Sequence, residues 1–389
     1  MVTTVDAVVI GAGINGASVA YNLAKRGSKN IAIVERFTIA SGGTGKSAAI
    51  VRQHYSNEVL IRMVKRSRDI FEFFADVIGG SAGFVKTGYF FFVPDYASDA
   101  FDANMALQQK LGIKTRAISK EDAREISPQI DSTDAERIAY EPDSGYADPY
   151  ESTISYLQAA QMLGARFYQN CPVQSIRVHQ NKVQGVVTPK VEFSTGVVVN
   201  VSGPWANKVG GMVNIKYPMQ VTREQEVILR PQSPLDAPKL TVSDMCNAIY
   251  FHPFGQDLLV GRGYPKEYQE VDPDSYSEGS DPDFVEDTVE RIVKRAPSMK
   301  TATILKGYSG LYDVTPDWHP IISGHPEVEG FYSAIGFSGH GFKLAPAVGE
   351  AVAELIAEGK SKSADLSLFS PDRFINGKAF KAAYGGNRA

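Results

Sequence analysis

The most constraining feature of this chain is a set of glycines that stands between two short apolar runs near its beginning. Residues 6–10 and 31–34 are almost entirely apolar, which is typical of strands buried on both faces of a parallel sheet. Between them, Gly11, Gly13 and Gly16 lead into apolar residues at helical spacing, which end in a basic pair and a glycine. This order of strand, glycine turn, helix and strand predicts one βαβ unit of a Rossmann-like domain.

Each of these glycines has a mechanical role in a dinucleotide site. Gly11 permits the tight turn, Gly13 lets the backbone approach a pyrophosphate, and Gly16 lets the helix pack closely on the strand. Glu35 directly follows the second strand, and its carboxylate is predicted to accept hydrogen bonds from both ribose hydroxyls. A purely structural glycine turn would not need this acid. The predicted site also includes the neighbouring residues Ile14, Asn15 and Arg36.

A second cluster of small residues follows Glu35, over residues 41–47. The glycine fingerprint alone leaves NAD and FAD open, but an extended flavin dinucleotide needs a second place of close approach along its length. The predicted cofactor site therefore extends to Ser41, Gly42, Thr44 and Ser47. A flexible loop that binds no ligand is the alternative interpretation of this cluster.

The composition is that of an ordinary globular protein and excludes several classes. The chain has 389 residues, of which 43% are hydrophobic and 22% charged, with a net charge of −4. This length predicts two to three domains, the charge gives no field that would recruit nucleic acid, and no apolar run is long enough for a membrane span. The two cysteines, Cys171 and Cys246, form no metal-binding pattern. We therefore expect two free buried thiols, no metal site and a cytoplasmic protein.

Apolar patterns predict the remaining elements. Helices are predicted over residues 59–78, 151–163, 283–296 and 344–358. Strands are predicted within residues 83–94, 166–168, 173–178, 182–187, 196–201, 217–263 and 331–335. The acidic segment 264–282 is rich in Pro, Ser and Tyr and is expected to be a solvated surface loop. A glycine-rich turn, residues 336–341, joins the last strand to the last helix.

Together these elements predict an α/β fold (α+β overall), in which a β-rich antiparallel-sheet domain is inserted into a Rossmann-like dinucleotide-binding domain. The Rossmann-like domain is predicted to comprise residues 1–85, 141–216 and 307–370, and the inserted domain residues 86–140 and 217–306. Residues 371–389 form a C-terminal tail, whose end is expected to fray.

Three segments carry a resemblance to a known family. The run GAGINGASVAYNLAKRG with its following VE, the segment from Ser41 to Arg52, and the segment from Gly307 to Gly349 resemble the FAD-dependent D-amino-acid oxidase (DAO) superfamily. Within it, the chain is similar to the branch of sarcosine oxidase and the sarcosine oxidase β-subunit. The most specific parts are the sequences TPDWHP at residues 315–320 and GFSGHGFK at residues 336–343.

The resemblance implies FAD as the cofactor and a small carboxylate-bearing amine as the substrate. Sarcosine or another N-methyl amino acid, glycine, proline or a D-amino acid would have its C–N bond oxidised by hydride transfer to flavin N5. The helix that follows Gly341 would aim its positive end at the ring, where reduced flavin carries negative charge.

Several site residues are carried over by position. The resemblance makes Arg52 and Lys343 a clamp for the substrate carboxylate, and a guanidinium fork with an ammonium suits that group. Tyr250 and Tyr312 would line the same pocket. His340 would contact flavin or substrate, with a packed loop histidine as the alternative. The remaining predicted cofactor contacts are Ala48, Val173, Ser202, Gly203, Trp205, Gly310, Gly336, Gly339, His340, Gly341, Phe342 and Lys343.

Four departures from the family pattern bear on the chemistry. Gly310 stands where monomeric sarcosine oxidase has the cysteine that attaches its flavin, and residues 44–48 lack the histidine of the dimethylglycine branch. The resemblance therefore implies noncovalent FAD. Leu259 stands in place of an oxygen-activating lysine, so a dehydrogenase using a quinone or dye-type carrier is slightly favoured over an oxidase. Gly263 replaces an active-site histidine, whose space His252 is able to fill.

Three other functions stay open. The chain would alternatively be a partner-dependent flavoprotein subunit that relays electrons, an FAD-dependent hydroxy-acid dehydrogenase of the same fold, or an NAD-dependent enzyme. A phosphate-bearing substrate would need a second basic cluster beside Lys343, and the sequence offers none there. His54 and His319 are interpreted as structural residues.

Overall fold

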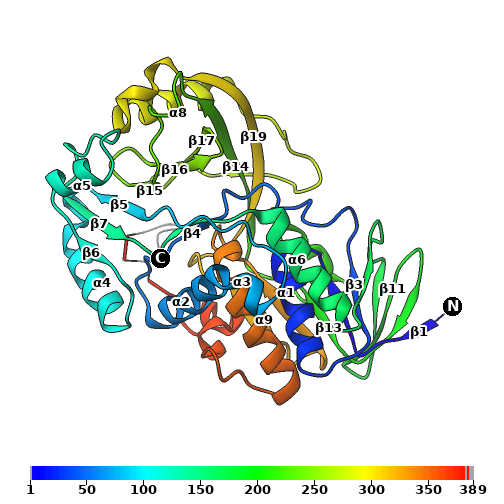
Figure 1. Cartoon of the computed structure of the whole chain (residues 1–389). Helices are drawn as coiled ribbons and strands as arrows, with labels where there is room; N and C mark the ends of the chain where they lie inside the picture. Colours follow the sequence, from blue (N-terminus) through cyan, green and yellow to red (C-terminus); the bar gives the residue numbers. More distant parts are fainter. Residues whose placement is uncertain (1, 382, 385–389) are drawn as a thin grey trace.

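The computed structural model describes residues 2–381 and 383–384, and its chain forms two parts that differ in architecture (Figure 1). The part drawn at the lower right contains a six-stranded sheet in which each neighbouring pair is parallel, except for the antiparallel edge pair β20–β21. In spatial order its strands are β20 (Ile321–Gly324), β21 (Phe331–Ile335), β13 (Val198–Asn200), β2 (Ala7–Ile10), β3 (Ile31–Val34) and β9 (Arg166–Tyr168). This is the predicted Rossmann-like architecture.

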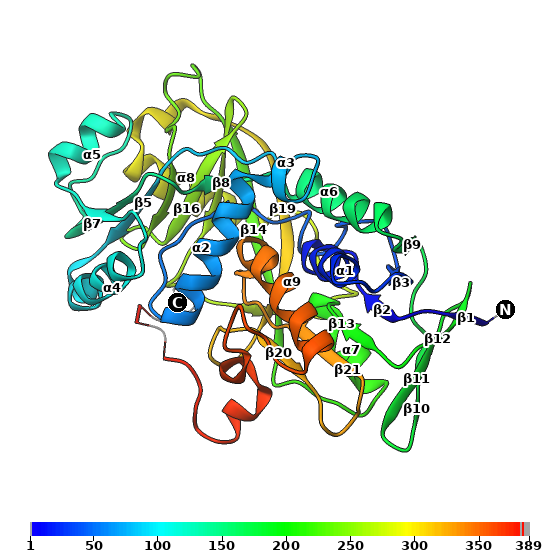
Figure 2. The same ribbon diagram turned by 60° about the horizontal axis from the view of Figure 1, so that its bottom comes forward.

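Helices cover this sheet and share its core. They are α1 (Ile14–Lys25), α2 (Glu58–Glu72), α3 (Phe74–Val77), α6 (Pro149–Met162) and α9 (Gly341–Glu358). Figure 2 shows α9 between α1 and α2. Gly349 permits this packing, because a Cβ there would lie 2.1 Å from the Ser18 hydroxyl. The predicted helix over residues 59–78 divides at Phe73, and the last helix begins at Gly341 rather than at Leu344.

The parallel strands direct four distant segments to one edge of the sheet. The loops at the carboxyl ends of β2, β3, β13 and β21 carry residues 11–16, 35–36, 202–205 and 336–341. Ligands of open α/β sheets bind at this edge, so the topology brings together most of the motifs that the sequence analysis singled out.

Two smaller sheets complete this part of the molecule. One has the order β1 (Val2–Thr4), β12 (Glu192–Ser194), β11 (Lys182–Val187) and β10 (Ser175–His179). The other pairs β4 (Ile50–Val51) with β8 (Gly145–Tyr146). Strand β4 directly precedes Arg52, so this short ladder fixes the start of the Arg52 segment.

The second part contains a nine-stranded sheet, which is antiparallel apart from the pair β15–β5. Its strands are β5 (Tyr89–Val93), β6 (Arg116–Ala117), β7 (Arg137–Glu141), β14 (Gln220–Arg230), β15 (Thr241–Asp244), β16 (Ile249–Phe254), β17 (Asp257–Arg262), β18 (Gln269–Glu270) and β19 (Thr303–Val314). Its helices are α4 (Ser98–Lys110), α5 (Lys120–Ile126) and α8 (Pro282–Arg295). A separate hydrophobic core lies between α8 and this sheet.

The sequence patterns missed several elements of this second part. Helices α4 and α5 and strands β7 and β19 were not among the predicted elements. Strand β19 pairs with β14 from Val314 opposite Gln220 to Thr303 opposite Arg230, so the predicted boundary between residues 306 and 307 falls inside a strand of the large sheet. The domain boundaries as a whole stay predictions.

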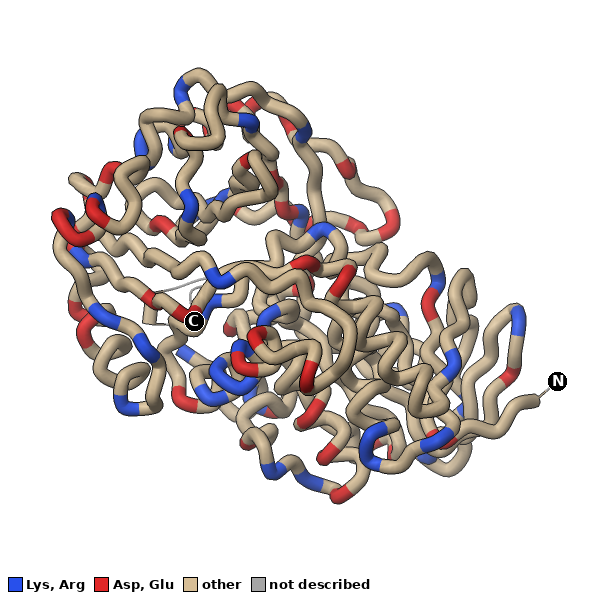
Figure 3. The backbone as a smooth tube through the Cα atoms, viewed as in Figure 1, with Lys and Arg blue, Asp and Glu red and all other residues tan. Residues whose placement is uncertain are grey.

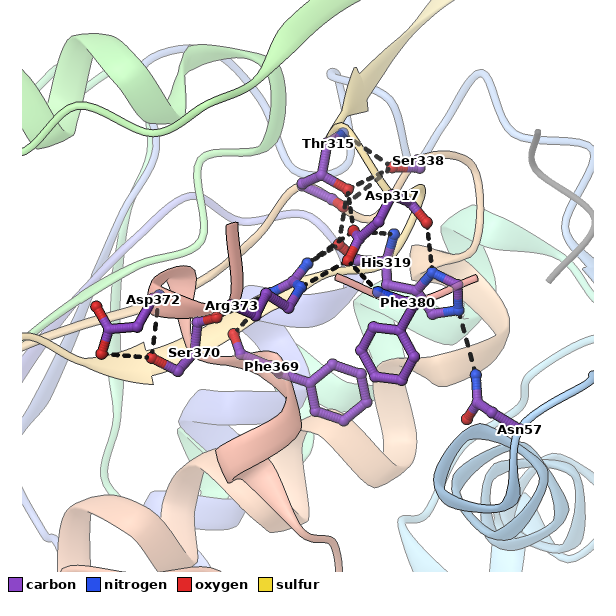
Figure 4. Close-up of polar contacts among 11 residues, drawn as sticks. Asn57, Thr315, Asp317, His319, Ser338, Phe369, Ser370, Asp372, Arg373 and Phe380 are labelled. Carbon is purple, nitrogen blue, oxygen red and sulfur yellow. Dashed lines mark hydrogen bonds and ion pairs between the residues drawn. The ribbon is translucent and has the colours of Figure 1, made fainter. Parts of the chain in front are cut away.

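The C-terminal tail is held by a buried ion pair (Figure 4). The guanidinium of Arg373 donates to Asp317 at 2.7 and 3.0 Å, and the ring of His319 stacks on Phe380 at 4.2 Å between centroids. Tyr384 is 6% exposed. These contacts anchor the tail at Arg373, Phe380 and Tyr384, while the end that is expected to fray, residues 385–389, lies outside the described residues.

Surface properties agree with the composition. Figure 3 shows acidic and basic residues interspersed over both parts of the molecule. Both cysteines are free, with Cys171 buried and Cys246 half-buried. None of the described helices has the length and apolar character needed to span a bilayer.

Candidate active site

A long cleft crosses the carboxyl ends of β2, β3 and β13 and continues onto β14 and β19. It has about 1660 Å³ of space, counting the part open to solvent. Most of the predicted cofactor contacts line it: Gly11, Gly13, Ile14, Asn15, Glu35, Arg36, Ser41, Gly42, Thr44, Ser47, Val173, Ser202, Gly203, Trp205, Gly310, Gly339, Gly341 and Phe342. The fold thus gathers residues from four distant stretches of the chain into one cavity.

The glycine turn after β2 forms a cradle that side chains would fill. Gly11 has a φ of +114°, and a Cβ there would lie 2.6 Å from the carbonyl oxygen of Val201. A Cβ on Gly13 would lie 2.9 Å from the Thr44 hydroxyl, which accepts a hydrogen bond from the Ile14 N–H at 3.2 Å. Asn15 Oδ1 is buried without a hydrogen-bond partner in this cleft. The close backbone and the helix N-terminus fit a pyrophosphate, whereas the unpartnered Asn15 Oδ1 is an acceptor and fits a hydroxyl or N–H donor of the cofactor.

Glu35 is held rigidly at the end of β3. Its two oxygens accept hydrogen bonds from the N–H groups of Ala12, at 3.0 Å, and Phe37, at 2.9 Å. A carboxylate has further lone pairs, so the group is oriented without being saturated. This arrangement agrees with the predicted contact to a ribose.

The acidic segment 264–282 is not a free solvated loop, as the sequence analysis expected. Asp274 accepts hydrogen bonds from Arg36 and from the Trp205 indole, both at 2.7 Å, and also from Lys208. The hydrogen bond from Lys208 lowers the pKa of this carboxyl, and those from Arg36 and Trp205 act in the same direction. All three donors line the cleft, so the segment fastens the second part of the molecule to the cleft wall.

A second pocket of about 760 Å³, counting open space, adjoins this cleft. The two cavities share Ser47, Tyr312 and Gly339. The predicted site residues Ala48, Arg52, Tyr250, Tyr312, His340 and Lys343 all line the pocket. Its other walls come from Ala49, Ile50, His54, Tyr89, Phe91, Ser243, Ile249, Gly263 and Tyr384.

Arg52 and Lys343 give this pocket its charge. The guanidinium of Arg52 donates to the carbonyl oxygen of His54 and lies 4.7 Å from the centroid of the Tyr55 ring. Lys343 is 7% exposed, and its Nζ donates to the carbonyl oxygen of Gly339 at 3.3 Å. Among the residues described here, no carboxylate lies within 4.0 Å of either cation. Burial lowers the pKa of Lys343 well below its usual range, and the charge of Arg52 adds to this effect.

Tyr312 and His340 form the boundary between the pocket and the cleft. A Cβ on Gly339, whose φ is +86°, would lie 2.5 Å from the Tyr312 ring, so this glycine admits the ring. Burial raises the pKa of Tyr312 well above its usual value. The Nδ1 of His340 shares a hydrogen bond with the Tyr55 hydroxyl at 2.9 Å. Both aromatic groups are therefore fixed before a ligand binds.

Five predicted cofactor contacts lie elsewhere than on the cleft wall. Ala48, His340 and Lys343 face the second pocket. A Cβ on Gly16 would lie 1.9 Å from the carbonyl oxygen of Gly11, so this glycine serves the packing of helix on strand. Gly336 approaches the Thr315 methyl and donates its N–H to Asp313 at 2.7 Å. Gly16 and Gly336 therefore have packing roles next to the cleft, whereas Ala48, His340 and Lys343 lie in the second pocket.

The positions of His252 and His54 differ from those expected from the sequence. His252 packs against Tyr146 at 4.3 Å between ring centroids and is not among the pocket-lining residues, whereas Gly263 is. His54, interpreted as structural, lines the pocket. Its Nε2 shares a hydrogen bond with the Tyr384 hydroxyl at 3.3 Å, and burial lowers its pKa.

Sequence reasoning also missed residues that only the fold brings to the site. Tyr384 reaches the pocket from the tail, and no local pattern marks it. Glu224 and Glu226 line the cleft from β14. A usable signal existed for these two, because strand alternation places Thr222, Glu224 and Glu226 on one face, and all three are buried.

The fold and these two cavities define a dinucleotide-binding protein with an adjoining pocket for a small anion. The family model for FAD dependent oxidoreductases matches residues 6–355. The chain therefore belongs to this FAD-dependent oxidoreductase (DAO) family, whose cofactor is FAD.

Individual relatives agree in fold and in general chemistry. The crystal structure of L-proline dehydrogenase from P. horikoshii superposes with a TM-score of 0.90 at 33% identity, covering 98% of this chain and all of that one. Human mitochondrial sarcosine dehydrogenase is 28% identical over 96% of this chain. The sarcosine oxidase subunit beta of Rhodobacter capsulatus is 24% identical, over 95% of this chain and 90% of its own length.

The names of these relatives refer to amino-acid substrates. The chain spans only 42% of the length of the human sarcosine dehydrogenase, and similar fractions of the mitochondrial dimethylglycine dehydrogenases, from 44 to 45%. The resemblance noted in the sequence is confirmed at the level of the family.

Proposed function

We propose that this protein oxidises the C–N bond of a small amino or imino acid, whose carboxylate is held between Arg52 and Lys343. The observation that carries the proposal is a pair of cations, without a carboxylate partner among the described residues, in a pocket that adjoins the FAD cleft. Removing charges from water costs several kcal/mol unless they are paired. A substrate carboxylate would supply the missing partner.

The pocket residues have separable roles in this proposal. Arg52 would bind the carboxylate with its two-pronged guanidinium, and Lys343 would add a point charge from the first turn of α9. Carboxylate binding favours the protonated form of Lys343, against the lowering of its pKa by burial and by Arg52. Tyr250 and Tyr312 would close the pocket and exclude water around the reacting carbon. When bound, FAD supplies the hydride acceptor at N5.

The cofactor is proposed to bind without a covalent link. Gly310 has no side chain to attach it, and a Cβ there would approach that of Lys46 at 3.0 Å. Cys171 lines the cleft, but its N–H donates to the carbonyl oxygen of Glu35 at 2.7 Å, which places it beside the predicted ribose site. Release of free FAD on acid precipitation is the expected outcome, and flavin that stays with the protein pellet would contradict it.

We propose a dehydrogenase rather than an oxidase. Leu259 is 2% exposed within β17 and is not among the pocket-lining residues, so it offers no cation to developing superoxide. The electron acceptor would then be a quinone or dye-type carrier. Similarity to a protein named sarcosine oxidase subunit beta favours, as a second candidate, a subunit that passes electrons to a partner chain. The free thiols suit a cytosolic location.

An anaerobic titration of the purified flavoprotein tests the proposal. L-Proline, sarcosine, dimethylglycine, glycine and D-alanine are added in turn while the visible flavin band is followed. At least one of them should bleach the band, and readmitted air should restore it slowly compared with an artificial dye. A flavoprotein that none of them bleaches would contradict the proposed substrate class. Turnover with oxygen as fast as with dye would contradict the dehydrogenase.

A further inference from the structure

Three strands of the large sheet bring a tyrosine and a buried glutamate together across a glycine. Gly261 on β17 lies between its register partners, Tyr250 on β16 and Glu226 on β14. A Cβ on Gly261 would lie 2.3 Å from the Tyr250 ring. Because this side chain is absent, the ring lies across β17, and the Tyr250 hydroxyl donates to Glu226 Oε1 at 2.8 Å.

Glu226 is a titratable group whose side chain has a hydrogen bond only with this tyrosine among the described residues. It is 2% exposed and lines the FAD cleft, and its Oε2 is buried without a hydrogen-bond partner. Tyr250 lines the substrate pocket on the other side. The pair therefore connects the pocket to a carboxylate that lies outside it.

We propose that Tyr250 and Glu226 form a proton relay that takes a proton from the substrate nitrogen, an inference that rests on the proposed function. The ammonium form of an amino acid has no lone pair on nitrogen, so a proton must leave before hydride departs from the neighbouring carbon. Glu226 acts in this relay through Tyr250 and is a positioning residue, whereas Tyr250 touches the substrate.

The step moves one proton and changes no oxidation state. An N–H bond of the substrate breaks as its proton moves to the phenol oxygen of Tyr250. The original O–H bond of Tyr250 breaks at the same time, and its proton moves to Oε1 of Glu226. The nitrogen keeps the electron pair, which then supports hydride departure to FAD. Glu226 later returns its proton to water.

The electrostatic surroundings suit a group that changes protonation. Burial raises the pKa of Glu226 to about 8, against the effect of the Tyr250 hydrogen bond. Burial keeps the pKa of Tyr250 well above its usual value, so the phenol relays a proton rather than storing a charge. Glu224 on the same strand also raises the pKa of Glu226, whereas Lys266, which pairs with Glu224, lowers it. From β19, Tyr308 and Tyr312 also act on this group of side chains.

A matched pair of ligands tests the relay without turnover. Pyrrole-2-carboxylate presents an N–H beside its carboxylate, and furan-2-carboxylate presents an oxygen in the same place. Ionised Glu226 orients the Tyr250 hydroxyl toward itself, and the phenol oxygen, beside which the Tyr312 hydroxyl also lies, then accepts the pyrrole N–H. Arg52 and Lys343 would bind the carboxylate of both ligands, so their contributions cancel in the ratio of the two dissociation constants.

The measurement is the dissociation constant of each ligand, from the flavin absorbance change, between about pH 6.5 and 9.5. In the wild-type holoenzyme, pyrrole-2-carboxylate should gain about 5-fold in affinity relative to furan-2-carboxylate as pH rises through the Glu226 pKa, the worth of about one hydrogen bond. Glu226→Gln and Tyr250→Phe should each abolish this gain. Glu270→Gln, the same change at an exposed position of the same sheet, should retain it.

Flavin reduction gives a second readout. With L-proline under anaerobic conditions, Glu226→Gln should slow reduction by about 100-fold at high pH, a usual size for lost general base catalysis. The rise of rate with pH should disappear as well. The double variant Tyr250→Phe with Glu226→Gln should be no slower than the slower single variant, because both belong to one path.

The outcomes separate the relay from the function on which it rests. If neither ligand perturbs the wild-type flavin, the carboxylate clamp and the proposed function both fail. If both ligands bind but the pyrrole gain persists in Glu226→Gln, the relay alone is wrong. A pH profile of flavin reduction that is the same in Glu226→Gln and the wild type would also overturn it.

Discussion

Buried cations in this protein occur in two contrasting settings. Arg373 donates to Asp317 at 2.7 Å, with side chains only 3% and 2% exposed, and Arg295 pairs with Asp244 in the second part of the molecule at the same distance. Arg52 and Lys343 have no such partner among the described residues. The first two guanidiniums each contact a carboxylate directly, whereas Arg52 has only the more distant charge of buried Glu141, and the proposal is that a substrate anion supplies the direct partner.

This difference distinguishes a buried cation that joins two segments of the fold from one that binds a ligand. A buried ion pair joins two segments, and removing one member leaves the other as an uncompensated charge. A cation without a partner lowers the stability of the folded protein, so its presence is explained by a ligand rather than by folding. Substitutions of the two kinds should therefore change stability in opposite directions.

The largest effect is expected from breaking a completed pair. Arg373→Met should lower the free energy of unfolding by about 3–5 kcal/mol, because it leaves the Asp317 carboxylate buried alone. Urea unfolding of the flavoprotein measures this loss. Arg230→Met, which breaks the exposed pair with Asp257, should cost less than about 1 kcal/mol. Equal losses in the two variants would mean that the buried pair does not hold the tail.

Removing an incomplete cation should instead affect binding. Arg52→Ala is expected to raise the KM for the substrate about 100-fold, or ~2.7 kcal/mol, because the carboxylate loses its two-pronged partner. Stability should stay unchanged or rise. Steady-state kinetics with a dye acceptor and thermal unfolding are measured on the same preparation. Arg62→Ala, at an exposed pair with Glu58, serves as the control. A fall in stability without a change in KM would place Arg52 with the structural cations.

The effect of Lys343 on the stability of the folded protein is expected to depend on pH. Its pKa is depressed in the folded protein by burial and by Arg52, so the unfolded chain binds more protons between the folded and unfolded pKa values. Stability should therefore rise with pH over that window, and it is lowest below the folded pKa. Lys343→Met should remove this penalty and raise the melting temperature at neutral pH, by about 1 °C for each kcal/mol recovered in a chain of 389 residues. The advantage should shrink toward about pH 10.

Melting curves across this pH range check the Lys343 expectation. Lys65→Met provides a control, since Lys65 donates to a backbone carbonyl outside both cavities. A Lys343→Met protein that is less stable than the wild type at neutral pH would show that this ammonium is compensated within the fold.

The smallest effect is expected at the edge of the FAD cleft. Asp274 joins the acidic segment to Arg36, Trp205 and Lys208, but its side chain is 39% exposed. Asp274→Ala should raise the dissociation constant of FAD about 2- to 5-fold, since solvent screens such pairs. Fluorescence of released flavin during dilution measures the change. Glu267→Ala, at an exposed position of the same segment, should leave FAD binding as in the wild type.

Local sequence patterns were most informative where structure depends on neighbours in the chain. Spacing alone predicts the glycine turn, the helix that follows this turn, and Glu35. This is because a βαβ unit is formed by neighbouring stretches of the chain. Strand β19 was missed because its partner β14 lies about eighty residues away in the sequence. The strand is stabilised by pairing with β14, which the residues near β19 in the sequence do not show. The same reason applies to Tyr384, whose place in the pocket depends on the path of the whole tail.

What the sequence by itself determined is the dinucleotide-binding unit and the family, because backbone freedom and side-chain chemistry at these positions are properties of the residues; the clamp of Arg52 and Lys343 stays a proposal. Only the tertiary structure decided whether a given buried cation has a carboxylate in contact with it. Arg52 and Arg373 are the same residue type, and neither sequence context shows which has a carboxylate within reach. Pairing depends on segments about fifty positions apart, as for Arg373 with Asp317 and Arg295 with Asp244, and burial then makes the difference energetically large.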